Sequence, residues 1–286
     1  MRLLFVSLSL VILIGVAGFA AATLDVYFMD VGHGDAILID CGDWEALLDA
    51  GSLSETVSEQ AMSILDECVE DHIIELLILS HPHEDHYSFF ADVFSEFGVL
   101  EIWRSADTAP NLFNTARAAY PPSLDSDRPD QRELTYGERQ LTGCLLWTVL
   151  GPSDPIPAAT DDRAINDNSL VLLLQYGTVS FLFAGDIHTE AEPVLLRIDL
   201  PQGTLVLKVP HHGSANSASP DFVARTNPEL AIVSGLREDL SDAVVVRLGD
   251  EGVPFLTTFE NGTICVSTDG NAVRVRLLGT SIGDDT

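Results

Sequence analysis

Short apolar runs alternate with polar turns along most of the chain, which is the pattern of a mixed α/β protein. Residues 73–79 are apolar at every position except Glu75, as expected of a strand that is buried on both faces. Residues 24–29 alternate between outward and inward positions and predict a first strand. Between 56 and 69, apolar residues recur at helical spacing, so this segment is predicted to be a helix.

The same reasoning extends to the rest of the chain. We expect further strands at 37–40, 45–49, 99–104, 143–150, 169–175, 179–184, 205–209, 230–234, 255–259, 263–266 and 273–278, and further helices at 87–97, 189–198, 220–225 and 242–248. The segment 105–139 shows neither pattern, and we interpret it as an exposed connection rather than as a cover over a site. We find no internal repeat and no linker, so residues 23–286 are predicted to form one domain.

The first 22 residues have the features of an export segment. Arg2 is followed by an almost unbroken apolar stretch from Leu3 to Val16, and then by the small residues of a cleavage site. We therefore expect residues 1–22 to be a signal peptide or an N-terminal anchor, and the protein to act outside the cytoplasm. Membrane contact is expected only through this segment if it stays uncleaved, because no later stretch reads as a membrane span.

The charge of the chain is strongly acidic. Its 286 residues include 14 Lys and Arg against 44 Asp and Glu, a formal net charge of -30, while 46% of the residues are hydrophobic. The apolar content argues against disorder, and concentrated salt screens such repulsion. We therefore expect a halophilic source; an acidic protein of ordinary salt is the alternative. In either case no basic patch is available to attract nucleic acid.

The four cysteines are Cys41, Cys68, Cys144 and Cys265. Their wide spacing excludes a zinc ribbon. An exported protein can form disulfides from them, and isolated buried thiols fit equally well, so the sequence leaves both alternatives open.

The segment from His81 to His86 carries the strongest chemical signal. It reads His-Pro-His-Glu-Asp-His and directly follows the predicted buried strand at 73–79. His81 and His83 alternate, so one turn can direct both at a single cation, while Asp85 and His86 can reach a second cation nearby. A polar surface loop with scattered histidines is the alternative, and three imidazoles within six positions after a buried strand argue against it.

Two more loops place polar groups where a predicted strand ends. Gly185-Asp186 follows the strand at 179–184, and His211-His212 follows the strand at 205–209. Asp186 is a carboxylate suited to bridge two ions, and the histidine pair can supply one ligand and one proton donor. An ordinary turn residue and a buried histidine pair are the alternatives. The single histidines His33, His72 and His188 are not predicted to be ligands.

These motifs resemble the metallo-β-lactamase superfamily, and in particular the hydrolase domain of ComEC-like competence (DNA-uptake) proteins. The resemblance is carried by Asp-Val-Gly-His-Gly-Asp-Ala at 30–36, Leu-Asp-Ala-Gly at 48–51, Ser-His-Pro-His-Glu-Asp-His at 80–86, Asn-Asp-Asn-Ser-Leu-Val at 166–171, Gly-Asp-Ile at 185–187 and Lys-Val-Pro-His-His-Gly-Ser at 208–214. It implies an αββα sandwich of two mixed β-sheets flanked by helices.

The resemblance also implies a site for two divalent metal ions, Zn²⁺ or Mn²⁺. By position, His81 and His83 would hold the first ion, Asp85 and His86 the second, Asp186 would bridge them, and His211 would complete the second site. Asp85 would also orient the attacking hydroxide, and His212 would protonate the leaving oxygen. Substrate contacts would come from Asn168, Ser169 and Ser214, and Asn166 or Asn168 stands near the place of a further histidine ligand in many members.

The chain departs from the ComEC-like pattern at three places. His33 stands where that branch has Gln, Tyr87-Ser88-Phe89 replaces small residues, and Arg237-Glu238-Asp239 replaces a His-Pro motif. Without the His-Pro motif, the chain lacks the histidine that would contact substrate after the strand at 230–234, whereas the predicted metal positions are intact.

The expected function is a secreted or membrane-anchored metal-dependent hydrolase that cleaves phosphodiester bonds in extracellular DNA. The charge of -30 opposes DNA binding, and high salt would weaken that repulsion. A metallohydrolase of a small ester, lactone or lactam is one alternative, and a non-catalytic, metal-stabilised extracellular binding protein is another.

Overall fold

The structure is a computed structural model that describes residues 23–105, 129–156, 159 and 161–279 of the chain. The predicted export segment lies outside the described residues, and so does most of the predicted connection at 105–139. Among the described helices, none is both long enough and apolar enough to cross a membrane.

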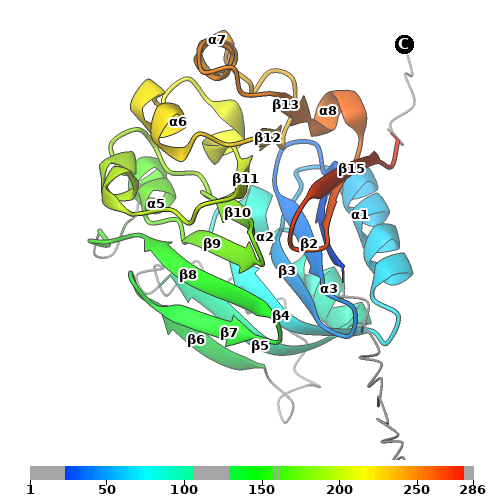
Figure 1. Cartoon of the computed structure of the whole chain (residues 1–286). Helices are drawn as coiled ribbons and strands as arrows, with labels where there is room; N and C mark the ends of the chain where they lie inside the picture. Colours follow the sequence, from blue (N-terminus) through cyan, green and yellow to red (C-terminus); the bar gives the residue numbers. More distant parts are fainter. Residues whose placement is uncertain (1–22, 106–128, 157–158, 160, 280–286) are drawn as a thin grey trace, which may run out of the picture.

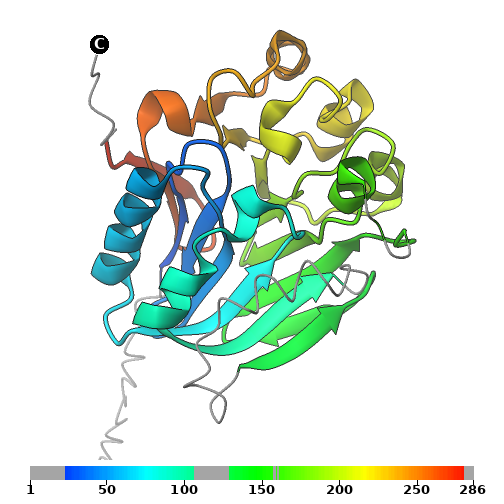
Figure 2. The same cartoon turned by 180° about the vertical axis from the view of Figure 1, so that it is seen from behind.

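Two β-sheets lie face to face with helices on their outer sides, which confirms the predicted αββα sandwich (Figures 1 and 2). The first sheet has the strand order β15-β14-β1-β2-β3-β4-β5-β6 and the second the order β13-β12-β11-β10-β9-β8-β7. Both sheets are mixed. Strands β3, β4, β5 and β6 are parallel to one another, and so are β10, β11, β12 and β13. All other neighbouring strands pair antiparallel.

The strand bounds follow the apolar pattern closely. In the first sheet they are β1 Leu24–Phe28, β2 Ala36–Asp40, β3 Glu45–Ala50, β4 Ile73–Leu79, β5 Gly98–Ser105, β6 Asp130–Leu134, β14 Ile264–Thr268 and β15 Val273–Leu277. In the second they are β7 Arg139–Thr142, β8 Leu145–Gly151, β9 Val171–Tyr176, β10 Val179–Phe183, β11 Thr204–Lys208, β12 Leu230–Val233 and β13 Phe255–Thr257. Strand β6 lies within the segment predicted to be an exposed connection, and β7 begins at its last residue, Arg139.

The core explains why the central strands are apolar at successive positions. Ile78 of β4 packs into the layer between the two sheets, whereas Leu77 packs into the layer beneath the helices on the outer side. Successive side chains of a strand point to opposite faces, so a strand covered on both faces needs apolar residues throughout. The inter-sheet layer is closed by aromatic pairs, including Trp103 with Trp147 at a ring distance of 5.8 Å.

Helices cover the outer face of each sheet. The helices of the described residues are α1 Glu55–Cys68, α2 Glu84–Tyr87, α3 Phe90–Glu96, α5 Asp162–Asp167, α6 Pro220–Thr226, α7 Asp242–Asp250 and α8 Thr258–Asn261, with 3₁₀ helices η2 Glu192–Arg197 and η3 Pro210–Gly213. Helices α1 and α3 lie over the first sheet (Figure 2), and α6 and α7 pack their apolar residues into the outer layer of the second.

Three elements differ from the predicted ones. The helix expected at 87–97 is divided into α2 and α3, because the backbone N of Phe89 donates to Ala50 O and not to the helical carbonyl of Asp85, which accepts from Asp35 N. Ser88 Oγ also donates to Ser52 O and accepts from Ser52 N. The helix expected at 189–198 is the shorter 3₁₀ helix η2, which has Pro193 in its first turn. The strand expected at 255–259 ends at Thr257, where α8 begins.

Candidate metal centre

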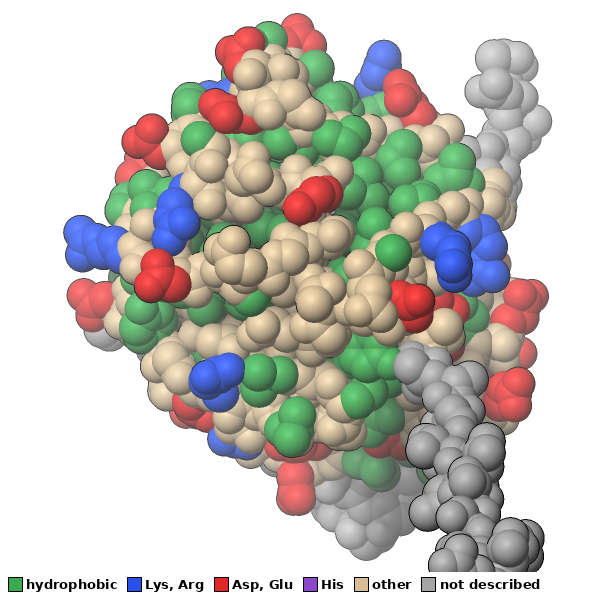
Figure 3. Space-filling view, in the orientation of Figure 1, with side chains coloured by type: hydrophobic (Ala, Val, Ile, Leu, Met, Phe, Trp, Pro, Cys, Tyr) green, Lys and Arg blue, Asp and Glu red, His purple; other side chains and the backbone are tan. Residues whose placement is uncertain are grey.

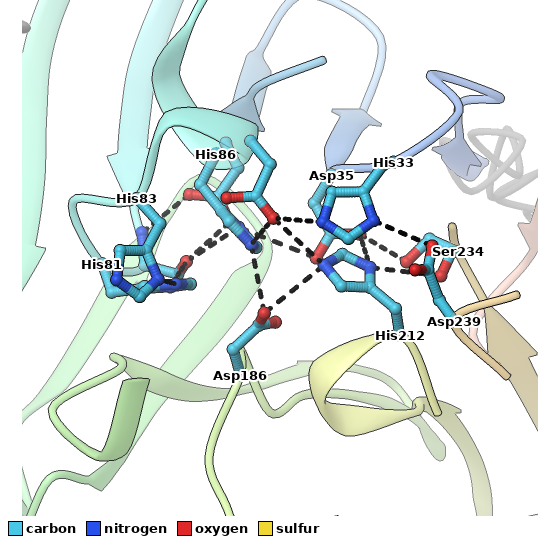
Figure 4. Close-up of polar contacts among 12 residues, drawn as sticks. His33, Asp35, His81, His83, His86, Asp186, His212, Ser234 and Asp239 are labelled. Carbon is cyan, nitrogen blue, oxygen red and sulfur yellow. Dashed lines mark hydrogen bonds and ion pairs between the residues drawn. The ribbon is translucent and has the colours of Figure 1, made fainter. Parts of the chain in front are cut away.

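Side chains from three loops meet at the ends of β4, β10 and β11 (Figure 4). His86 Nε2 and His212 Nε2 each lie 3.4 Å from the same oxygen, Oδ2 of Asp186. On the other side, Oδ2 of Asp85 lies 3.7 Å from His86 Nε2 and 3.6 Å from His212 Nε2. Two imidazole nitrogens and two carboxylate oxygens therefore surround a common point.

Several of these atoms are buried without a hydrogen-bond partner. His86 Nε2, His212 Nε2 and Asp186 Oδ1 are all in this state, although leaving a buried polar atom unpaired costs about 1–3 kcal/mol. Together with Asp35, these three residues each place one potential ligand atom within 4.8 Å of the others. Neutral imidazole and carboxylate are the ligands that divalent transition metals prefer, so the donor set fits a metal ion.

The electrostatics of the cluster also favour a cation. Burial lowers the pKa of His86, but Asp186 and Asp49 outweigh it and raise the pKa well above its usual value. The pKa of His212 is raised to about 10 in the same way, with burial opposed by Asp186 and Asp35. Nearby positive charge therefore stabilises the buried carboxylates, and either protons or metal ions can supply it.

Hydrogen bonds on the far side of each ring direct Nε2 into the cluster. His86 Nδ1 donates to Asp49 Oδ2 over 2.9 Å, and His212 Nδ1 donates to the carbonyl oxygen of Ser234 over 3.2 Å. Asp49 is held in turn by the backbone N and the Oγ of Ser80, both at 2.7 Å. Partners of this kind set the tautomer and the orientation of a metal-binding histidine.

His81 and His83 form a second group of donors beside this cluster. His81 Nε2 lies 3.1 Å from His83 Nδ1, and the rings of His81 and His86 are 4.1 Å apart. Two nitrogens bound to one tetrahedral Zn²⁺ at 2.0–2.1 Å would be about 3.3 Å apart, so the observed spacing suits a shared ion. Burial holds the pKa of His81 well below its usual value, which keeps it in the neutral form that binds metals.

The structure brings together most of the predicted ligands, but it separates the two adjacent histidines. His212 Nε2 lies 3.6 Å from Asp85 Oδ2 and 3.4 Å from Asp186 Oδ2, whereas the ring of His211 lies edge-on to that of His188 at 4.8 Å, with its buried Nδ1 lacking a hydrogen-bond partner. Both have left-handed backbone conformations, with φ of 49° and 50°. That conformation is uncommon for residues other than glycine, and a sequence pattern does not reveal it.

The three residues predicted to contact the substrate form hydrogen bonds within the protein. The side chain of Asn168 is buried and holds both the N and the O of Ile156, at 2.8 and 2.9 Å. Ser169 is fully buried, and its Oγ accepts from the backbone N of Asp186. Ser214 Oγ donates to Asn216 over 2.7 Å. Asn168 and Ser169 thus support loops at the site instead of offering free groups to a substrate.

Lys208 and Asp35 were missed by the sequence analysis. Lys208 is the only lysine of the chain, and it is fully buried with Nζ 2.5 Å from Asp35 Oδ2 and 3.6 Å from Asp186 Oδ1. Burial lowers the pKa of Lys208, but the two carboxylates outweigh it and raise the pKa. Ser234 Oγ donates to the other oxygen of Asp35. A single lysine within a motif, in a chain that otherwise uses arginine, was the available signal.

His33 and Asp239 also belong to the site. His33 Nδ1 donates to Asp239 Oδ2 over 2.9 Å, and its Nε2 lies 3.3 Å from Asp85 Oδ2. The contact with Asp85 raises the pKa of His33 against the effect of burial, and Asp239 raises it further. His33 and Asp239 belong to two of the three departures from the ComEC-like pattern, and they contact each other in space. The side chain of His33 is 34% exposed, so it lies at the accessible edge of the site.

Glycine is required where the motif loops pack against each other. A Cβ on Gly51 would lie 2.0 Å from the carbonyl carbon and oxygen of Asp85. At the same place Gly51 N donates to Asp35 O, and Asp35 N donates to Asp85 O. The loops that precede β2 and follow β3 are thereby joined to the loop that carries His86.

Comparisons with known proteins agree with this geometry. Residues 25–158 match the model of the metallo-β-lactamase superfamily. The chain is 25% identical over 261 residues to ComE operon protein 3 of Bacillus subtilis (strain 168), covering 84% of this chain and 32% of that protein. It is 28% identical over 230 residues to Recombination protein 2 of Haemophilus influenzae, covering 75% of this chain and 24% of that protein.

Among solved structures, the chain is similar to the metallo-β-lactamase fold protein YhfI from Bacillus subtilis. The TM-score is 0.58 at 10% identity, covering 86% of this chain and all of YhfI. The chain spans about a third or less of the length of the two curated relatives. The family match, the shared fold and the order of the motifs together show that the chain carries a metallo-β-lactamase superfamily domain, with ComEC-like proteins among its relatives.

Proposed function

We propose that the protein is a hydrolase that uses two divalent metal ions to cleave phosphodiester bonds, with DNA outside the cell as its substrate. The observation that carries the proposal is the pair of unpartnered, buried nitrogens of His86 and His212, both 3.4 Å from one oxygen of Asp186. The relation to ComE operon protein 3 and Recombination protein 2 supports DNA as the substrate.

In this proposal the chain's residues divide into two groups of ligands. His81 and His83 would hold one ion, and Asp85, His86 and His212 the other, with Asp186 between them. Bound divalent ions supply a hydroxide nucleophile at neutral pH and stabilise negative charge on a phosphoryl oxygen. Asp49 and Ser234 keep the imidazoles of His86 and His212 in position.

The proposed role of His212 replaces the role that we expected for His211. His212 would be a ligand, so it would not also act as the proton donor. His33 is the imidazole at the accessible edge, 3.3 Å from Asp85, and it would contact the substrate there.

The test is hydrolysis of linear DNA and of bis(p-nitrophenyl) phosphate in about 1–2 M NaCl, with Zn²⁺ or Mn²⁺ and with EDTA. We expect EDTA, His86→Ala and Asp186→Asn each to abolish turnover. His72→Ala is the matched control, because His72 is exposed and its imidazole pairs with Asp66 and packs against Phe97, away from the cluster. Hydrolysis that survives EDTA and both site variants would refute the proposal.

A measurement of metal content distinguishes the proposed roles of His211 and His212. We expect about two Zn²⁺ per chain in the wild type and in His211→Ala, and loss of one ion in His212→Ala. Altering partners that merely support a ligand costs 10–100-fold in affinity, so loss of the ligand itself should exceed 100-fold in a chelator competition. The opposite result would return the ligand role to His211.

A small ester, lactone or lactam is the second candidate substrate, and the charge of the molecule favours it. The chain carries 44 acidic against 14 basic residues, and its only lysine is buried. On the face shown in Figure 3, Lys and Arg side chains are scattered among acidic ones and form no continuous patch. Metal-dependent cleavage of a lactone or ester without cleavage of DNA would favour this candidate.

Location outside the cytoplasm also belongs to the proposal. It rests on the apolar N-terminal segment with its small-residue cleavage site. Expression with this segment, followed by fractionation and N-terminal sequencing of the product, tests it.

A further inference from the structure

Two cysteines that are far apart in the chain meet across the two sheets. The Sγ atoms of Cys41 and Cys144 lie 3.1 Å apart, although 103 positions separate them in the sequence. Cys41 is in the turn between β2 and β3 of the first sheet, and Cys144 is in the turn between β7 and β8 of the second. Their contact therefore joins the two sheets at the turns of these hairpins.

Both turns are held in place by their own hydrogen bonds. Cys41 N donates to Trp44 O over 3.0 Å, which closes the first turn. Thr142 and Leu145 are paired across the second turn, and Thr142 Oγ1 accepts from Trp147 Nε1 over 2.9 Å. Cys41 also packs against the inter-sheet core. The sulfurs consequently meet because two closed hairpins place them together.

The remaining two cysteines have other surroundings. Cys265 is fully buried, with Sγ 3.6 Å from Ser267 Oγ and 3.4 Å from Arg276 Nη2. Burial raises the pKa of the Cys68 thiol, and the neighbouring Tyr27 lowers it. All four cysteines are free thiols in the structure, and the pair at 41 and 144 differs from the others in having its sulfurs in contact.

We propose that Cys41 and Cys144 are a redox pair that forms a disulfide between the two sheets by exchange with a disulfide-bearing oxidant. The exposed Cys144 thiolate attacks the oxidant, forms a mixed disulfide and releases one thiol. The Cys41 thiolate then attacks Cys144 Sγ, forms the inter-sheet disulfide and releases the second thiol. Two protein thiols are oxidised, and one external disulfide is reduced to two thiols. The sulfurs need to approach by only about 1 Å to reach bonding distance.

The order of attack follows from exposure. Cys144 is exposed, whereas Cys41 is partly buried, and burial together with the neighbouring Cys144 raises the pKa of Cys41 to about 12. A large oxidant therefore reaches Cys144 first.

The disulfide would stabilise the fold, because it closes a long loop in the unfolded chain. A loop of this length restricts the unfolded ensemble strongly, and we expect the oxidised form to melt on the order of 10 °C above the reduced form. Such a bond persists in oxidising compartments, which agrees with the proposed export but does not depend on the proposed hydrolase activity.

The test equilibrates the full chain with oxidised and with reduced glutathione, in EDTA so that no metal intervenes. We expect the count of free thiols in the denatured protein to fall from four to two, and the intact mass to fall by about 2 Da. Digestion at acidic residues should release one linked pair of peptides, which contain Cys41 and Cys144.

Serine variants serve as matched controls. Cys68→Ser should still form the bond, so its thiol count should fall from three to one, and its melting temperature should rise on oxidation. Cys41→Ser and Cys144→Ser should show no linked peptides and no such rise. Four free thiols after oxidation, a lasting glutathione adduct on Cys144, or a bond between other cysteines would overturn the proposal. None of these measurements is an activity assay, so the proposed disulfide is tested independently of the proposed function.

Discussion

Replacing Lys208 by Met tests whether the only lysine of the chain is an essential charge partner of the site. Lys208 is fully buried, and its Nζ contacts one oxygen each of Asp35 and Asp186. Met has a similar length and no charge, so the substitution removes the ammonium and creates little empty space. Asp35 then keeps the hydroxyl of Ser234 but loses its nearest cation, while His86 Nδ1 and His212 Nδ1 remain 3.8 and 4.0 Å from its oxygens.

The expected loss of stability follows from the burial of both partners. Lys208 and Asp35 are 0% and 2% exposed, so solvent does not screen their interaction. Removing one partner of a buried ion pair leaves the other charge uncompensated, at a cost of about 3–5 kcal/mol. We expect the metal-free Lys208→Met variant to lose this much free energy of unfolding. The loss should be smaller with Zn²⁺ bound, because the metal ions bring positive charge close to Asp186.

Urea unfolding in EDTA measures the loss, and Asp35→Asn with the double variant completes a double-mutant cycle. We expect a coupling energy of about 2–3 kcal/mol between Lys208 and Asp35. Because the chain has one lysine, selective ¹⁵N-lysine labelling yields a single side-chain signal, which should shift on metal addition. A Lys208→Met variant within about 0.5 kcal/mol of the wild type, the range of ordinary surface substitutions, would refute the reasoning.

Three further predictions concern other parts of the molecule. Burial and the neighbouring Glu75 raise the pKa of Glu45 to about 8, so the folded state keeps a proton that the unfolded state releases near pH 4.5. The loss of folding free energy that results grows as pH rises from about 4.5 to 8. Glu45→Gln should therefore stabilise the protein by about 1–4 kcal/mol at pH 8 but little at pH 4, as measured by urea unfolding at both pH values. Equal effects at the two pH values would contradict this. Asp239→Asn should weaken Zn²⁺ binding about 10–100-fold through His33 and Asp85, by chelator competition, and unchanged affinity would argue against that support. With a net charge of -30, the melting temperature should rise between about 0.1 and 2 M NaCl, and a flat or falling profile would contradict the expected halophilic behaviour.

The sequence was informative where one local pattern decided the structure. The apolar run at 73–79 became β4, and the hairpin expected at 37–49 formed as β2 and β3. It was least informative at the sheet edges, where β6 is polar and largely exposed and therefore lacks an apolar pattern. It also failed at Phe89, because a backbone hydrogen bond to the distant residue Ala50 interrupts the predicted helix.

The sequence by itself determined that imidazoles and carboxylates follow the ends of buried strands, because the apolar pattern locates the strands and the motif residues come directly after them. Only the tertiary structure decided which atoms face each other. His212 contributes a potential ligand atom to the cluster, and both it and His211 have a left-handed backbone that the sequence does not reveal. Lys208 meets Asp35 because residues far apart in the chain lie at one edge of two packed sheets. Such contacts depend on the packing of distant segments, which no local pattern encodes.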